Sequence, residues 1–331
     1  MLSGASAFVQ TKRGRLRDFG TRADELQNVA VIFVTYGFAP AGIQSPRKGQ
    51  MLMAVHSPAQ IAEIAASYGA KKARLPLPTV LVLGFLAGAY IALGFLLDIR
   101  VIGNAPAEWG SFANFIGASV FPVGLILVLL AGGELLTGNM MAVSMARLCG
   151  RITTLEWGKN LALVTIANFA GALFVAYVFG HTVGLTADGP YLEKLVDMAR
   201  HKLEDGFLQA FFSGIGCNWL VALAVWLSYG AGSMGGKVLG IWFPTMAFVA
   251  IGFQHVVANM FLIPAAIFAG YFTWGDYLAN FAAVWLGNLA GGALFVAGAY
   301  WTAYLKDAGK ATGSKQDSPV SEPVKSVSSR G

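Results

Sequence analysis

The chain has 331 residues, of which 56% are hydrophobic and only 12% are charged, and its mean hydropathy is +0.61. A typical soluble domain has about 25% charged residues, so the composition excludes a soluble enzyme and a disordered chain and predicts a polytopic membrane protein. Two cysteines are too few for a disulfide framework, and the net charge of +6 suggests membrane orientation rather than a nucleic-acid partner.

The first 56 residues are predicted to be an N-terminal extension outside the membrane core. Their one apolar stretch, Val29–Phe38, is too short to span a membrane, and no small-residue cleavage site follows it. Ser57-Pro-Ala-Gln60 has the pattern of a capping box, which predicts an amphipathic helix to about Lys72 along the cytoplasmic face. Residues 57–306 form the predicted membrane domain, and residues 307–331 are predicted to be a disordered cytoplasmic tail.

Six segments are apolar enough and long enough to cross a membrane. They are Thr79–Leu97, Phe115–Val143, Leu161–Gly180, Phe207–Ser228, Gly240–Ala269 and Tyr277–Tyr304. The second and fifth are too long for one simple crossing, and each contains a polar interruption, at residues 131–139 and 252–259. Interrupted backbone is tolerated at membrane depth only where protein buries it or where it lines a cavity, so these two segments are predicted to be broken helices that meet near the midplane.

Basic residues gather in the loops on one side of these spans. Lys71 and Lys72 precede the first span, Arg147 and Arg151 follow the second, and further lysines follow the sixth. The opposite loops hold mainly acids, including Asp98 after the first span. Because Lys and Arg favour the cytoplasmic side, both termini are predicted to be cytoplasmic.

The two halves of the domain share an internal repeat. Asn139-Met140 aligns with Asn259-Met260, and the Asn-x-Ala-Gly element at residues 168–171 aligns with the one at residues 288–291, in both cases 120 positions apart. Each unit holds three spans, an odd number, so the second must cross the membrane in the opposite sense. The predicted fold is therefore all-α, with six transmembrane helices in two inverted three-helix repeats.

Ionisable groups are rare inside the predicted spans. Glu134 is their only carboxylate and His255 their only imidazole, and such groups at membrane depth usually serve function. The competing interpretations are a hydrogen-bonded core histidine and a carboxylate that only accepts N–H bonds from its own loop. No ATP-binding loop, catalytic motif or metal-ligand spacing is present, so we predict neither an enzyme nor a cofactor.

These residues resemble the formate/nitrite transporter family. The elements that carry the resemblance are Gly133-Glu-Leu-Leu-Thr-Gly-Asn139, Cys217-Asn-Trp-Leu-Val221, the run from Phe248 to Phe261 with its His-x-x-Ala-Asn-Met element, and Gly287-Asn-Leu-Ala-Gly-Gly292. The resemblance implies an aquaporin-like protomer in a bacterial inner membrane and a homopentamer with one pore per protomer. It also implies transport of formate, nitrite, hydrosulfide or their protonated acids, either passively or coupled to protons.

The resemblance also assigns pore residues by position. His255 matches the central pore histidine, and Lys202 matches the lysine of the periplasmic vestibule. The other matching positions are the threonine of the broken second span with two gate residues beside it, the aromatic and aliphatic constrictions, and the pore asparagine: Thr137, Leu135, Leu136, Phe121, Leu125, Phe248 and Asn218.

One position departs from the family pattern. Many members have Glu before the histidine, and this chain has Gln254. A carboxylate beside an imidazole favours its charged form, so Gln254 is expected to make His255 harder to protonate. Two other interpretations remain open, a water or neutral-solute channel with the same architecture and a membrane scaffold that transports nothing.

Overall fold

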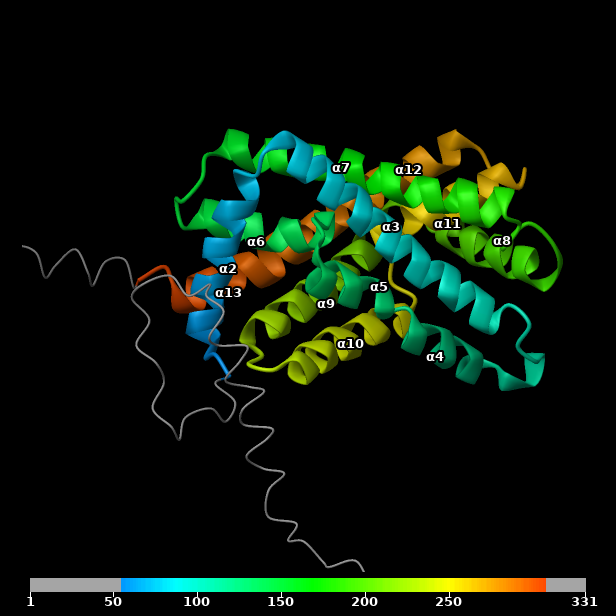
Figure 1. The fold of residues 1–331 in the computed structure, drawn as a ribbon, viewed down its shortest axis with the longest axis horizontal. Helices are drawn as coiled ribbons and strands as arrows, with labels where there is room; N and C mark the ends of the chain where they lie inside the picture. Colours follow the sequence, from blue (N-terminus) through cyan, green and yellow to red (C-terminus); the bar gives the residue numbers. More distant parts are fainter. Residues whose placement is uncertain (1–54, 308–331) are drawn as a thin grey trace, which may run out of the picture. The chain divides into compact units, whose positions relative to one another are not determined.

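The computed structural model describes residues 55–307, which are helical almost throughout and include no strand (Figure 1). All but the first residue of the predicted tail, and nearly all of the predicted N-terminal extension, lie outside the described residues.

The described residues contain six helices or helical runs that are long and apolar enough to cross a membrane, as predicted. The first half consists of α2 (Pro58–Ala73), α3 (Leu77–Ile102), η1 (Ala107–Trp109), α4 (Ser111–Val120), α5 (Val123–Ile126), η2 (Leu127–Gly132), α6 (Leu136–Leu148), α7 (Thr154–Phe174) and η3 (Val175–Thr182). The second half consists of α8 (Gly189–Glu204), α9 (Phe207–Gly230), α10 (Met234–Ile251), α11 (Val256–Phe268), α12 (Trp274–Ala290), η4 (Gly291–Gly298) and α13 (Ala299–Tyr304).

The second and fifth spans are broken where the sequence predicts. Extended backbone separates η2 from α6 and α10 from α11. Gly132 and Gly252 end the first pieces with φ of 107° and 89°, a left-handed conformation that a residue with a Cβ rarely adopts. The chain then turns into a short second helix, so the N-termini of α6 and α11 lie inside the protein.

Two equivalent asparagines hold these buried helix starts. The Oδ1 of Asn168 on α7 accepts the N–H of Leu136 at 2.8 Å, and the Oδ1 of Asn288 on α12 accepts the N–H of Val256 at 2.9 Å. Each side-chain amide also donates to a carbonyl within the broken segment. A helix start has N–H groups without partners in its first turn, so both asparagines satisfy donors that no water reaches. Their matching roles confirm the inverted repeat.

Small residues bring the unbroken helices together. In Figure 1, α3 and α7 run side by side, and Gly171 on α7 lies directly against the backbone carbonyl of Phe85 on α3. Gly287 on α12 lies in the same way against Phe211 on α9. A Cβ at either glycine would overlap the partner backbone, which is the close approach expected of small residues in membrane helices.

The first span is longer than the sequence predicts. The sequence ends it at Leu97 and places Asp98 in a loop, whereas α3 continues to Ile102 and buries Asp98. Asp98 and Arg100 therefore lie within a spanning helix, which corrects the prediction that Glu134 is the only carboxylate in the spans. The third helical run, Thr154–Thr182, includes His181, which corrects the prediction that His255 is their only imidazole. Gly117 of α4 lies against the Asp98 carboxyl group and, having no Cβ, leaves room for it, a contact between segments that hydropathy does not reveal.

Candidate transport site

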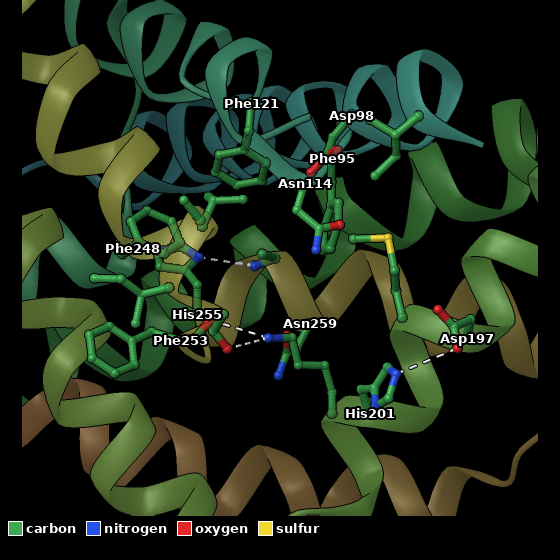
Figure 2. A pocket seen from close by; sticks show the side chains of 18 of the residues that line it. Phe95, Asp98, Asn114, Phe121, Asp197, His201, Phe248, Phe253, His255 and Asn259 are labelled. Atoms are coloured by element: carbon green, nitrogen blue, oxygen red, sulfur yellow. Dashed lines mark hydrogen bonds and ion pairs between the residues drawn. The ribbon is translucent and has the colours of Figure 1, made fainter. Parts of the chain in front are cut away.

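A cavity of about 440 Å³ is lined by residues of α3, α4, α8, α10 and α11, and we call it the α8 vestibule (Figure 2). Lys202 lines it, and so do Phe121, Phe248 and His255. The side chain of His255 is 2% exposed although it lines the cavity. Four residues that the sequence singled out from different elements thus share one cavity.

A second cavity, of about 370 Å³, is lined by residues of α2, η2, α6 and α9, and we call it the α2 vestibule. Glu134 and Leu135 of the first broken span line it together with Lys72 and Asn139. The two vestibules share no lining residue. Each broken span therefore borders its own vestibule.

His255 sits at the N-cap of α11, and its hydrogen bonds define its tautomer. Its Nδ1 accepts the backbone N–H of Ala258 at 3.1 Å, and its Nε2 lies 2.9 Å from the hydroxyl oxygen of Thr137. Because Nδ1 accepts, the proton of the neutral ring is on Nε2, which donates to Thr137. The hydroxyl proton of Thr137 is then free to be donated elsewhere. A second proton on the ring would have to displace the cap at Nδ1.

Aromatic rings lie beside this pair. The rings of Phe121 and Phe248 meet edge to face, with centroids 5.7 Å apart, and the ring of Phe248 stacks on the imidazole of His255 at 5.6 Å. Both phenylalanines are buried. Figure 2 shows the three side chains together on one part of the cavity wall. The approach to His255 from the α8 vestibule is therefore apolar.

Glu134 faces a lysine rather than its own loop. Its Oε1 accepts from Lys72 Nζ at 2.7 Å, and its Oε2 accepts from the amide of Asn139 at 2.8 Å. The interpretation of Glu134 as an acceptor of loop N–H groups alone is therefore wrong. The same amide of Asn139 also donates to Asn160 at 3.0 Å, so an ion pair and two amides join α2, α6 and α7.

Gln254 occupies the equivalent position of the second repeat, without the charge. Its Oε1 accepts from Asn259 at 2.8 Å and from Asn280 at 2.9 Å. Its amide donates to Asp205 at 2.6 Å. The carboxylate near this broken span is therefore supplied by the loop after α8 rather than by the position before His255.

Lys202 lies at the end of α8 and points to the second break. Its ammonium donates to the carbonyl oxygens of Gly252 at 2.7 Å and Phe253 at 3.3 Å. Burial disfavours the charged form and lowers the pKa of Lys202. The side chain is therefore partly buried and bonded to the second break rather than fully exposed to solvent.

The remaining predicted pore residues are buried and line neither vestibule. They are Leu125, Leu136, Thr137, Asn218 and Gln254. The amide of Asn218 donates to the carbonyl of Thr137 at 3.2 Å and to that of Asn288 at 2.7 Å. Asn218 therefore joins the two repeats beside Thr137, and both residues are buried outside the two cavities. Within residues 55–307, no His, Cys, Asp or Glu cluster is arranged to hold a metal ion.

The sequence model described as "Formate/nitrite transporter" matches residues 59–302. The chain belongs to the formate/nitrite transporter family. This transporter is 63% identical over 254 residues to the "Uncharacterized transporter YrhG" of Bacillus subtilis (strain 168), covering 77% of this chain and 96% of that one. It is 56% identical over 254 residues to the "Formate channel BtFdhC" of Bacillus thuringiensis, covering 77% and 98%.

Solved structures of the family have the same fold. The transporter superposes on a chain titled "FNT family ion channel" with a TM-score of 0.69 and 29% identity, covering 74% of this chain and 98% of that one. It superposes on a chain titled "Pentameric formate channel with formate bound" with a TM-score of 0.60 and 31% identity, covering 69% and 98%. The six-span fold predicted from the sequence is therefore that of a known channel family.

Two residues of the vestibules were missed as site residues. Lys72 was counted only as an orientation charge, and Asp98 only as a loop acid. A second sequence offset would have indicated Lys72, because Lys72 and Lys202 are 130 positions apart, as are Gly84 and Gly214, which accept from Asn168 and Asn288. The same offset pairs Asp98 with Ser228 and gives no signal for a carboxyl group there. The first span of each repeat is therefore related to its counterpart by an offset of 130 positions, whereas the two later spans are related by 120 positions.

Proposed function

We propose that this transporter moves formate across the membrane through a pore in each protomer, past His255 and Thr137. The observation that carries the proposal is the bond between these side chains, which joins the two broken spans: His255 lines the α8 vestibule, and Thr137 is buried and lines neither vestibule. Several relatives carry formate in their names, among them the formate channel of Bacillus thuringiensis, and one structural neighbour is titled as a formate-bound channel.

The proposed passage begins with attraction and continues with desolvation. An ammonium at the mouth of a low-dielectric hollow concentrates anions there, which is the role we give Lys202. The Phe121/Phe248 pair then excludes water from the anion. An unpaired anion in such a place is costly, so the next polar group it meets must compensate for its lost hydration.

The Thr137–His255 pair can supply that compensation. His255 Nε2–H donates to the Thr137 oxygen, which leaves the threonine hydroxyl free to donate to a formate oxygen. Hydrogen bonds in such a chain strengthen one another. Transient sharing of a proton with the substrate would lower its charge further, and this is the proposed basis for flux that rises at low pH.

The remaining architecture follows from the family and from the charge of the loops. We propose a homopentamer in the inner membrane of a bacterium, with the α2 vestibule and both termini on the cytoplasmic side because Lys and Arg gather there. The α8 vestibule then opens outward. Residues 57–306 would be the transport domain, with residues 1–56 and 307–331 outside it.

The test is uptake of labelled formate into proteoliposomes that contain the full chain, between about pH 5 and 8, with nitrite as competitor. We expect saturable uptake that rises at low pH. We also expect Thr137→Val and His255→Phe to reduce uptake by about tenfold or more, equivalent to about 1.4 kcal/mol of barrier each. His181→Phe, which changes an exposed histidine, is the matched control.

Different results would test the choice of formate as substrate and the role of the Thr137–His255 pair separately. No formate flux with nitrite or hydrosulfide still moving would overturn the choice of formate and retain the pore. Swelling in uncharged solutes alone would favour a neutral-solute channel. Full formate flux in both variants would refute the role of the Thr137–His255 pair.

A further inference from the structure

Asp98 is a buried carboxyl group that the proposed pathway does not use. It lies on α3 and lines the α8 vestibule, yet the residue is only 1% exposed. Its Oδ1 has no hydrogen-bond partner among the described residues and lies against Gly117 of α4, where a Cβ would overlap it. Figure 2 shows Asp98 beside Asn114 on the cavity wall.

The other charged and titratable side chains that line this cavity all have partners. They are Lys194, Asp197, His201, Lys202, Asp205 and His255. On α8, Asp197 lies 3.9 Å from Lys194 and 3.5 Å from His201, and beyond it Lys202 and Asp205 are held at the second break. His255 is bonded at both ring nitrogens. No titratable residue of α4 or α10 lines the cavity. The ammonium of Lys194 on α8 attracts the ionised form of Asp98, but among the described residues no ion pair or hydrogen bond joins the two side chains.

In the other repeat, the position equivalent to Asp98 holds an uncharged residue that lines the α2 vestibule. Asp98 and Ser228 are 130 positions apart, the same offset as Lys72 and Lys202, and Ser228 lines the α2 vestibule. Its hydroxyl donates to the carbonyl of Val225 at 2.7 Å, so it is neutral and satisfied. The carboxyl group is therefore not required by the fold of the repeat.

An ionised carboxylate is unsuited to this place in an anion pathway. Burial without a partner disfavours a charge at membrane depth, and a negative charge ahead of the Phe121/Phe248 pair repels an incoming anion. A carboxyl group that carries a proton has neither disadvantage and adds one O–H donor. Proton occupancy thus changes Asp98 from a repelling group to a binding group.

We propose that Asp98 is an anion-admitting residue of the α8 vestibule, whose protonated carboxyl group donates a hydrogen bond to the incoming monovalent anion and whose ionised form repels that anion. No proton leaves Asp98 in this step. The identity of the anion rests on the proposed function, whereas the proton on Asp98 does not. Entry from this side depends on pH even if the ring of His255 stays neutral throughout.

The first experiment compares the wild-type chain with Asp98→Asn in proteoliposomes, with the internal pH fixed and the external pH varied between about 5 and 8. The amide keeps the size and a donor but cannot ionise. We expect the half-saturation concentration for formate to rise by about tenfold towards high pH in the wild type, because a bare charge a few Å away opposes entry. It should stay nearly constant in the variant.

Asp197→Asn is the matched control, because Asp197 lines the same cavity but is exposed and partnered. We expect it to retain the wild-type pH dependence. The same dependence in Asp98→Asn, or an equal loss of flux at every pH, would overturn the proposal.

A second experiment needs no transport. Infrared spectra of the full chain should show the carbonyl band of a protonated carboxylic acid that titrates over the same range, is absent in Asp98→Asn and is shifted in Asp98→Glu. If the wild type carries no formate, the proposed function fails, and this band still decides whether Asp98 holds a proton. Absence of the band from the wild-type spectrum would overturn the proposal.

Discussion

Breaking the ion pair of the α2 vestibule should destabilise the protein by different amounts, depending on which partner is removed. Lys72 and Glu134 meet at 2.7 Å, with side-chain exposures of 20% and 7%. Lys72→Met removes the cation and leaves a buried carboxylate with only the amide of Asn139. Glu134→Gln removes the anion but leaves an ammonium that still reaches the vestibule.

The magnitudes follow from that difference in burial. Breaking a fully buried pair costs about 3–5 kcal/mol and breaking an exposed pair costs about 0–1, so Lys72→Met should cost about 2–4 kcal/mol. The amide of Glu134→Gln can accept from Asn139 as Gln254 accepts from Asn259, so this change should cost about 1 kcal/mol or less. The double variant should be close to Glu134→Gln alone, because no unpaired charge remains.

The assay is thermal unfolding of the four proteins in detergent, followed as the fraction that stays folded. We expect Lys72→Met to have the lowest midpoint and the added Glu134→Gln substitution to restore most of the loss. Equal destabilisation by the two single changes, or additive losses in the double variant, would refute the assignment of the cost to an unpaired carboxylate.

Three further predictions concern packing and the pore. Gly171→Ala should abolish folded yield because its Cβ would overlap the α3 backbone, whereas Gly158→Ala on the same helix, with no atom within 4 Å of its Cβ, should express normally. Phe121→Ala should raise acetate flux relative to formate flux in proteoliposomes, because it removes one ring of a pair 5.7 Å apart; an unchanged ratio would contradict a constriction there. Trp285→Phe should lower the free energy of unfolding by about 0.5–1.5 kcal/mol, because its N–H donates to Thr165 in the other repeat, and Thr165→Val should give a similar loss.

The two ionisable residues of the broken segments could be recognised from the sequence, and their hydrogen-bond partners could not. Glu134 and His255 were recognisable because ionisable groups are rare in apolar segments. Their partners lie far along the chain: Lys72 is 62 residues from Glu134, and Thr137 is 118 residues from His255. Which amide or ammonium reaches which oxygen depends on the packing of helices, and hydropathy does not report it.

Asp98 shows the same limit most clearly. A carboxylate at the end of an apolar run reads as the start of a loop, and the sequence was interpreted in that way. In the structure the helix continues past it, Gly117 of α4 leaves room for its carboxyl group, and residues of α8 line the same cavity.

By itself, the sequence determined membrane insertion, the six spans, the two breaks and the inverted repeat. These depend on segment length, apolar content and repeated short elements, all of which are local properties of the chain. Only the tertiary structure decided that Lys72 neutralises Glu134, that Asp205 supplies the carboxylate that position 254 lacks, and that the buried Oδ1 of Asp98 has no hydrogen-bond partner among the described residues. Those outcomes depend on distances between helices, and a hydrogen bond exists only where packing brings two groups within about 3 Å.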